Sequence, residues 1–354
     1  MIPTDRFLAL PDHPVPRCAV SKSRRTGVEI EFAGLGVADA AELVQDLWGG
    51  CLVPQSEREI TVEGGVCGRV KVELDISLKK KWAEDLAAQA LGDLVPVEII
   101  TAPLAQSQMV RAEDLVRALR AAGALGTQAK LAYGFGVHLN PELPVMTDAQ
   151  AKGAEHGICV GAFVSIASAY GLLEDWLRQS DPLDMARRVL PFVAPWPPAL
   201  VDALADSARA GPSKDVSAFA RLYARHAPTR NHGLDLLPAL EHLAAPALTD
   251  VPPEHLKGGR PTFHFRLPEA RLDTENWSIA YEWNRWCLIE TVAAMPELLA
   301  ELAEGWQAHR RALMPRRAQR CIEVEAFLQR ADIIGRMSCV LAGGSAGDPH
   351  QTRG

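Results

Sequence analysis

The sequence predicts an α+β fold, in which the strands of one antiparallel sheet are combined with amphipathic helices. Short segments with strict alternation of apolar and polar residues occur between residues 26 and 141 and again at 261–269, a pattern typical of half-buried strands. Helical periodicity lies between them at 38–48, 82–91 and 111–123, the last ending at Gly123. A helical, proline-interrupted stretch and long C-terminal helical patterns at 274–312 and 315–340 complete the chain.

These patterns divide the chain into five parts. We expect a proline-rich lead-in at 1–25, the first part of the sheet domain at 26–147 and a helical insertion at 148–258. The last strand and the C-terminal helices follow at 259–342, and a disordered tail at 343–354. The placement of the insertion between strands of one sheet suggests that it covers the sheet and sets specificity.

Composition limits the classes of partner. The 354 residues carry a net charge of −7, and the basic clusters are short, so we expect no nucleic-acid partner. The apolar stretch at 157–173 is rich in glycine and alanine, and it predicts a buried core helix and no membrane span. The N-terminal residues lack the pattern of a signal peptide. Seven scattered cysteines without a CxxC pair predict no disulfide framework and a cytoplasmic, reducing location.

The polar faces of the expected strands share one chemical character. In the segment 26–32, Val28, Ile30 and Phe32 face one way, and two glutamates face the other. A solvated face explains any single strand, but many acids on one face repel each other unless a cation lies between them. Divalent ions such as Mg²⁺ or Mn²⁺ favour oxygen and imidazole ligands. The five faces therefore predict a metal-loaded sheet, and they carry Glu29, Glu31, Glu73, Asp75, Glu98, His138, Asn140, His264 and Arg266.

Five motifs resemble, in order, those of the amidoligases: "TGVEIEF", "VELDISL", "VEIITAPL", "GFGVHLN" and "FHFRLPEARLDTENW". This family belongs to the carboxylate–amine ligases that share a catalytic sheet with glutamine synthetase and glutamate–cysteine ligase. The resemblance covers roughly residues 24–142 and 260–295. It implies a curved antiparallel sheet of the glutamine-synthetase type, holding divalent ions, ATP and a carboxylate substrate.

The resemblance also implies roles for individual residues. Glu29, Glu31 and Glu98 match metal ligands, and His138 matches a ligand of a metal or of an ATP phosphate. Asp75 and Ser77 match an element that lines the substrate, cofactor or metal site; Asn140 matches a substrate or cofactor contact, and Arg266 matches an arginine on the ATP phosphates. Relatives usually have glutamate where this chain has His264, which leaves the ion there open, because imidazole binds Mn²⁺ or Zn²⁺ better than Mg²⁺. Glu269, Ala270 and Arg271 replace a glycine–threonine turn.

The implied reaction is ATP-dependent amide formation through an acyl phosphate, with Mg²⁺ or Mn²⁺ neutralising the phosphates. Its substrates would be a small-molecule or peptide carboxylate and an amine, and a glutaminase-type amidotransferase is one partner that the resemblance allows. Glu73 or Asp75 would take the proton of the amine. Lys79 would reach a phosphate or lie in a solvated turn. Three readings stay open: this ligase, a metal-dependent hydrolase or phosphotransferase, and a non-catalytic nucleotide-binding or metal-binding relative.

Two further sets of residues have a simpler interpretation. Trp283 and Trp286 have helical spacing and are expected in the core, with adenine stacking as the alternative. Four histidines lie among helices and prolines and are expected at the surface or at helix caps: His226, His232, His242 and His255.

Overall fold

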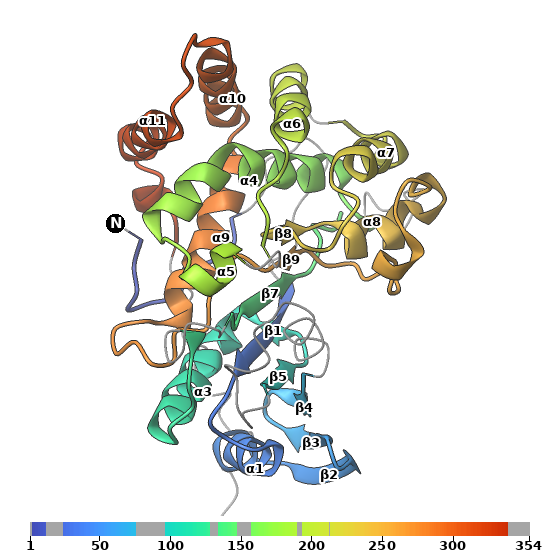
Figure 1. The fold of residues 1–354 in the computed structure, drawn as a ribbon, viewed down its shortest axis with the longest axis vertical. Helices are drawn as coiled ribbons and strands as arrows, with labels where there is room; N and C mark the ends of the chain where they lie inside the picture. Colours follow the sequence, from blue (N-terminus) through green and yellow to red (C-terminus); the bar gives the residue numbers. More distant parts are fainter. Residues whose placement is uncertain are drawn as a thin grey trace, which may run out of the picture.

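The computed structural model describes residues 2–11, 24–75, 96–127, 134–146, 157–189, 193–211 and 213–338, and shows one open antiparallel sheet flanked by helices (Figure 1). The strand order is β2-β3-β4-β5-β1-β7-β9-β8, and β6 also pairs with β1. The prediction of an α+β fold with an antiparallel sheet is confirmed. The strands are β1 (Arg25–Phe32), β2 (Cys51–Ser56), β3 (Glu59–Gly65), β4 (Gly68–Leu74), β5 (Val97–Thr101), β6 (Leu104–Ala105), β7 (Val137–Pro141), β8 (Leu234–Asp235) and β9 (His264–Phe265).

The helices pack in a row along the sheet. Helix α1 contacts β2, β3 and β4. From there, neighbouring helices contact one another in the order α1, α3, α9, α4 and α6. In Figure 1, α6, α7 and α8 gather near the β8–β9 edge, whereas α1 lies beside β2 and β3. The helices are α1 (Val37–Trp48), α3 (Met109–Ala121), α4 (Val160–Ser180), α5 (Met185–Val189), α6 (Pro198–Ala210), α7 (Val216–His226), α8 (Leu237–Ala244), α9 (Ile279–Ala293), α10 (Pro296–Arg311) and α11 (Arg317–Arg330).

The apolar face of the sheet forms the core. Val28, Ile30 and Phe32 of β1 are fully buried, because strand alternation turns all three toward the helices. On the adjoining part of the core, the ring of Trp286 from α9 lies 5.0 Å from that of Phe263, centroid to centroid. Trp283 and Trp286 are both 0% exposed, which confirms the core interpretation and leaves neither ring free to stack on adenine.

A hairpin joins β3 to β4. Gly64 and Gly68 have φ of 79° and 76°, a region that favours glycine, and they carry the chain from β3 into β4. The strands β2 and β3 were not expected. In β2, Pro54 interrupts the apolar pattern, which is tolerated because β2 is an edge strand.

The C-terminal helices are shorter than expected. The predicted helix at 274–312 is two helices, because Pro296 lacks the N–H that a continuous helix requires and instead begins α10. The helix expected from 315 to 340 ends at Arg330. The buried helix expected within 157–173 is confirmed as α4, and no helix among the described residues is long and apolar enough to cross a membrane.

The expected helical insertion is not entirely helical. Within it, β8 pairs with β9, so the insertion contributes a strand to the edge of the sheet. Some expectations lie outside the described residues: the helix at 82–91, the end of the strand with Ser77 and Lys79, and the tail at 343–354.

The N-terminal residues are held against α9. Leu8 N donates to Asn284 Oδ1 at 2.8 Å, and the indole of Trp283 donates to Leu8 O at 2.7 Å. The amide of Asn284 in turn donates to Pro3 O and Arg6 O. The lead-in therefore completes the core at its first residues.

The cysteines partly depart from expectation. Cys51, Cys67, Cys287 and Cys321 are free, whereas Cys159 is disulfide-bonded.

Candidate functional site

Three glutamates lie side by side on the polar face of the sheet. Glu98 of β5 pairs in register with Glu31 of β1 on one side and with Glu73 of β4 on the other. Glu59 of β3 extends the row, because it pairs with Glu73. Neighbouring strands lie about 4.8 Å apart, so these carboxylates repel one another strongly. Because the strands pair in this register, acids that alternate with apolar residues along each strand form one acidic row across β1, β5, β4 and β3.

His138 connects this row to the next strand. It pairs in register with Glu29, and its Nδ1 lies 2.9 Å from Glu29 Oε2, whereas its Nε2 lies 3.7 Å from Glu31 Oε1. The second oxygen of Glu29 accepts a hydrogen bond from Asn140 Nδ2 at 2.8 Å. Asn140, expected to contact substrate or cofactor, thus holds Glu29 in place.

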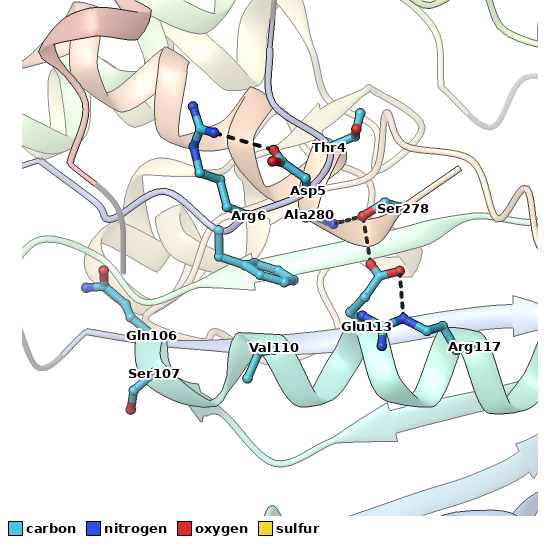
Figure 2. Close-up of a pocket in the computed structure, with 11 residues that line it drawn as sticks. Thr4, Asp5, Arg6, Gln106, Ser107, Val110, Glu113, Arg117, Ser278 and Ala280 are labelled. Atoms are coloured by element: carbon cyan, nitrogen blue, oxygen red, sulfur yellow. Dashed lines mark hydrogen bonds and ion pairs between the residues drawn. The ribbon is translucent and has the colours of Figure 1, made fainter. Parts of the chain in front are cut away.

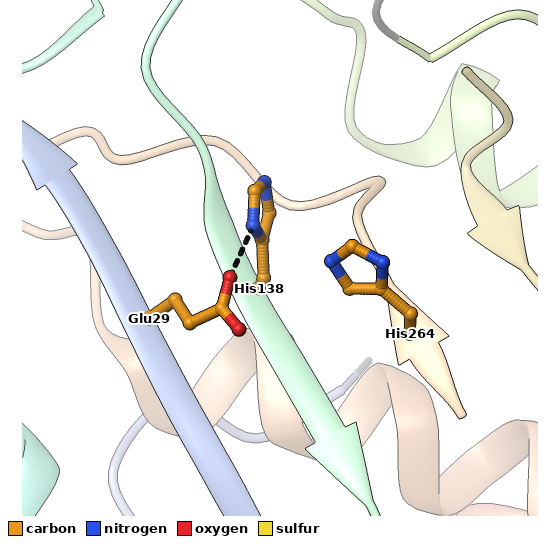
Figure 3. Close-up of side chains that lie close together, drawn as sticks. All are labelled: Glu29, His138 and His264. Atoms are coloured by element: carbon orange, nitrogen blue, oxygen red, sulfur yellow. Dashed lines mark hydrogen bonds and ion pairs between the residues drawn. The ribbon is translucent and has the colours of Figure 1, made fainter. Parts of the chain in front are cut away.

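Two triads of metal-ligand side chains share His138. The first is Glu29, His138 and His264, from β1, β7 and β9 (Figure 3); the second is Glu31, Glu98 and His138. Within each triad the ligand atoms all lie within 4.8 Å of one another. The structure thus brings together all five residues that the sequence marked as metal ligands.

Gly136 makes room for this arrangement. Its N–H donates to Glu31 Oε2 at 2.6 Å. A Cβ at this position would lie 2.7 Å from His138 Nε2 and 2.8 Å from Arg187 Nη1, closer than real Cβ contacts. A larger residue at this position would therefore require His138 or Arg187 to shift.

Burial and neighbouring groups shift the pKa values of Glu98 and Glu29 in opposite directions. Burial raises the pKa of Glu98 well above 4.5, and the nearby carboxylates of Glu29, Glu31, Asp75 and Glu73 raise it further. Burial also acts to raise the pKa of Glu29, but the hydrogen bond and electrostatic interaction with the His138 ring outweigh it, so this pKa lies well below its usual range. Glu98 is therefore harder to ionise than an ordinary carboxyl group, whereas Glu29 is easier to ionise.

Asp235 fixes the orientation of His264. Asp235 is fully buried, and its Oδ2 lies 3.2 Å from His264 Nδ1. Burial lowers the pKa of His264 to about 4, although the hydrogen bond to Asp235 opposes this shift. A carboxylate only accepts hydrogen bonds, so Nδ1 carries the ring proton and Nε2 keeps its lone pair. Nε2 is buried and makes no hydrogen bond within the described residues.

A cavity of about 340 Å³ covers this face of the sheet. Its acidic lining comes from the strands and includes Glu29, Glu31, Asp75 and Glu98. Gly134 and His138 line the cavity from β7 and the residues before it, and His264 and Arg266 line it from β9 and the residue after it. The insertion supplies the rest, which are mostly cationic or polar: Arg187, Arg230, Asn231, His255 and Lys257, with Glu254 the one acid among them.

Arg266 and Arg187 both line the cavity and are linked through the backbone carbonyl of Arg266. Arg187 donates to the carbonyls of Phe135, Pro268 and Arg266, the last at 2.6 Å. Arg266 Nη1 donates to Arg230 O, and its buried Nε makes no hydrogen bond in the part of the chain that the structure describes. Burial lowers the pKa of Arg187 to about 10, so it remains cationic at neutral pH.

A comparison with known protein families identifies the family of this chain. The family model described as "Putative amidoligase enzyme" matches residues 22–288, well over half of the chain. The chain belongs to the amidoligase family. The resemblance inferred from the five motifs is confirmed, and the match also runs through the insertion. Membership of the amidoligase family points to a ligase-type enzyme. A search of curated proteins found no match.

Two predicted catalytic residues of this amidoligase differ in position. Asp75 lines the cavity, but Glu73 is not among the described lining residues. Glu73 forms an ion pair with Lys71 on its own strand at 2.6 Å. Ser77 and Lys79 lie outside the described residues.

Sequence reasoning missed the residues that the insertion supplies to the amidoligase cavity. His232 is only 6% exposed, so the expectation of a surface position was wrong for it. His255 is half-buried at the end of a short 3₁₀ helix and lines the cavity. For Asp235 the sequence held one signal, a lone acid within the apolar segment "GLDLLP". A lone buried acid requires a partner, but the sequence does not indicate that the partners are His264 and Arg230.

A second cavity, of about 220 Å³, lies between the N-terminal residues, α3 and the start of α9 (Figure 2). Its charged side chains pair with each other: Arg6 with Asp5, and Arg117 with Glu113. Glu113 also accepts hydrogen bonds from Ser278 Oγ and Ile279 N at the beginning of α9. These contacts serve the helix and the lead-in, so the larger cavity is the candidate active site of the amidoligase.

Proposed function

We propose that this amidoligase is an ATP-dependent carboxylate–amine ligase, working on a sheet of the glutamine-synthetase catalytic type. The γ-phosphoryl group of ATP is transferred to a substrate carboxylate, which gives an acyl phosphate and ADP. The amine then attacks the acyl carbon, phosphate leaves, and the amine loses a proton. The net products are an amide, ADP and phosphate. Transfer of this kind depends mainly on positioning and charge neutralisation.

The mixture of acidic and cationic side chains in the lining of the cavity is the observation that carries this proposal. Carboxylates from the strands and arginine, lysine and histidine side chains, most of them from the insertion, line one cavity of about 340 Å³. Polyphosphate bound between them would meet arginines directly and would meet the acids through divalent cations. A site for a neutral substrate needs neither feature.

The residues present fit divalent cations. Glu98 is surrounded by carboxylates that raise its pKa, and a cation would remove that repulsion. Either Glu29, His138 and His264 or Glu31, Glu98 and His138 would hold an ion, because the single lone pair of the neutral His138 ring can bind only one of the two. Bound Mg²⁺ or Mn²⁺ would neutralise charge on the transferring phosphoryl group.

The protein's own side chains have separate tasks in this proposal. Arg266 binds phosphate oxygens with the donors that its contact to Arg230 O leaves free. Arg187 holds the backbone of Arg266 in position. Asp75 is assigned as the proton acceptor for the amine, because it lines the cavity whereas Glu73 is not among the described lining residues. Ser77 and Lys79 keep their proposed contacts to ATP, and an amidotransferase that supplies ammonia remains a proposed partner.

The test is a substrate screen with purified protein, ATP and Mg²⁺ or Mn²⁺. We expect ADP release that requires both a carboxylate and an amine, together with a new amide detected by mass spectrometry. Metal-dependent hydrolysis without ATP, or phosphoryl transfer without an amide, would replace the ligase with the hydrolase or phosphotransferase. Nucleotide binding without turnover across the screen would favour a non-catalytic relative.

A further inference from the structure

The two triads differ in their ligand atoms. The second, Glu31, Glu98 and His138, offers two carboxylates and one imidazole, whereas the first, Glu29, His138 and His264, offers one carboxylate and two imidazoles. The rings of His138 and His264 meet edge to face, with centroids 5.2 Å apart. Mg²⁺ prefers oxygen ligands, and imidazole nitrogen favours first-row transition ions.

His264 is held as a metal ligand is usually held. A metal-bound histidine generally donates its other ring N–H to a carboxylate or carbonyl, which fixes the ring and its tautomer. Here His264 Nδ1 contacts Asp235 Oδ2 at 3.2 Å, and Asp235 is 0% exposed. A proton on the buried Nε2 would be a donor without an acceptor within the described residues. Nε2 is therefore available as a lone-pair ligand beside Glu29 and His138.

Asp235 is itself fixed on both oxygens. Its Oδ2 also accepts from Arg230 Nε at 2.9 Å, and its Oδ1 accepts from Leu237 N at 3.0 Å, at the beginning of α8. The carboxylate therefore cannot turn away from His264 without breaking other buried contacts.

The geometry points to a transition-metal centre at Glu29, His138 and His264, positioned by Asp235, that selects an ion such as Mn²⁺ over Mg²⁺. This inference deepens the proposed function, on which it rests for the role of the triads as metal centres. His264 is a ligand of the ion, and Asp235 is a positioning residue that acts through His264.

The test measures metal binding directly, so it does not depend on finding the substrates. Calorimetric titration of the purified, EDTA-treated full-length protein with Mn²⁺ and with Mg²⁺ gives both affinities. We expect the wild type to bind Mn²⁺ at least about tenfold more tightly than Mg²⁺. Pulsed EPR of the Mn²⁺ form should show coupling to imidazole nitrogen. Comparable affinities for the two ions, or Mn²⁺ without nitrogen coupling, would overturn the inference.

Two variants distinguish the role of His264 from that of Asp235. His264→Gln replaces the nitrogen ligand with an amide and should remove most of the preference for Mn²⁺. Asp235→Asn keeps an acceptor for Leu237 N but weakens the hold on His264, and it should lower Mn²⁺ affinity by about 10- to 100-fold with a smaller effect on Mg²⁺. His255→Gln removes another cavity imidazole that is outside both triads, and it should leave the preference unchanged.

The outcomes distinguish this inference from the proposed function. If His264→Gln keeps the full preference for Mn²⁺, the centre is wrongly assigned even if the protein forms amides. If the preference depends on His264 but no amide forms in the screen, the metal centre stands and the ligase does not. Circular dichroism checks folding; should Asp235→Asn fail to fold, the result for His264→Gln alone decides.

Discussion

Replacing Glu98 by glutamine should stabilise the metal-free protein and weaken its response to metal. Glu98 lies in register between Glu31 and Glu73. Two unit charges about 5 Å apart interact by about 3 kcal/mol at an effective dielectric constant of about 20. Burial and this repulsion raise the pKa of Glu98 in the folded state. At about pH 7.5 the resulting free-energy cost is at most about 4 kcal/mol, since each of about three pH units above the usual pKa contributes about 1.4 kcal/mol.

The pH dependence follows from the raised pKa of Glu98. A carboxyl with a raised pKa in the folded state contributes stability that is present below its unfolded pKa and is lost as the pH rises. In EDTA, Glu98→Gln should therefore raise the free energy of unfolding by about 1–3 kcal/mol at about pH 7.5, and change it little at about pH 4.5. With Mn²⁺ the sign reverses, because the variant lacks a ligand and gains less from binding.

The assay is urea unfolding followed by circular dichroism, at three pH values and with EDTA or Mn²⁺. Glu63→Gln is the matched control, because Glu63 is exposed on β3 and makes only a long contact with Arg69 at 3.7 Å. Its effect should stay within about 0.5 kcal/mol under all conditions. If Glu98→Gln destabilises the protein in EDTA at neutral pH, or responds to Mn²⁺ as the wild type does, the reasoning about a cation within the acidic row fails.

Three further predictions follow from the site and the core. Arg266→Lys keeps the positive charge but loses the planar guanidinium donors, and Glu31→Gln removes a metal ligand. Both variants should lower kcat by at least about 100-fold while their circular dichroism stays unchanged. Near-normal turnover would contradict the mechanism. Gly136→Ala should displace His138 or Arg187 and weaken Mn²⁺ binding in calorimetry by tenfold or more (about 1.4 kcal/mol), whereas unchanged affinity would show that the strand yields. Trp286→Ala should cost about 3–5 kcal/mol in urea unfolding, and a loss of ATP binding without a loss of stability would revive the stacking alternative.

The sequence shows which side chains share one face of a strand, but it does not show which strands are neighbours in the sheet. Alternation alone placed Glu29, Glu31 and Glu98 on one face of their strands, because side chains in a strand point alternately to opposite faces. It could not show that Glu31, Glu98 and Glu73 lie in one row, since register depends on which strands pair. The same limit explains why His138 was not expected to face both Glu29 and Glu31.

The cationic side of the cavity was harder to predict. Arg187 lies in the five-residue helix α5, and Asp235 lies in the two-residue strand β8. Elements this short show no periodicity that identifies a buried face. Their positions follow from tertiary contacts, such as the pairing of Asp235 with His264 across β8 and β9.

The hydrogen bonds that hold the N-terminal residues against α9 have a consequence for biosynthesis. Leu8 and Asn284 are separated by 276 positions, and the buried pair of Arg24 and Glu290 is separated by 266. A chain that leaves the ribosome from its amino end must therefore keep Leu8 and Arg24 unsatisfied until most of the polypeptide has been made. Assembly at this point is necessarily late, and a chaperone that shields the emerging segment should raise the yield.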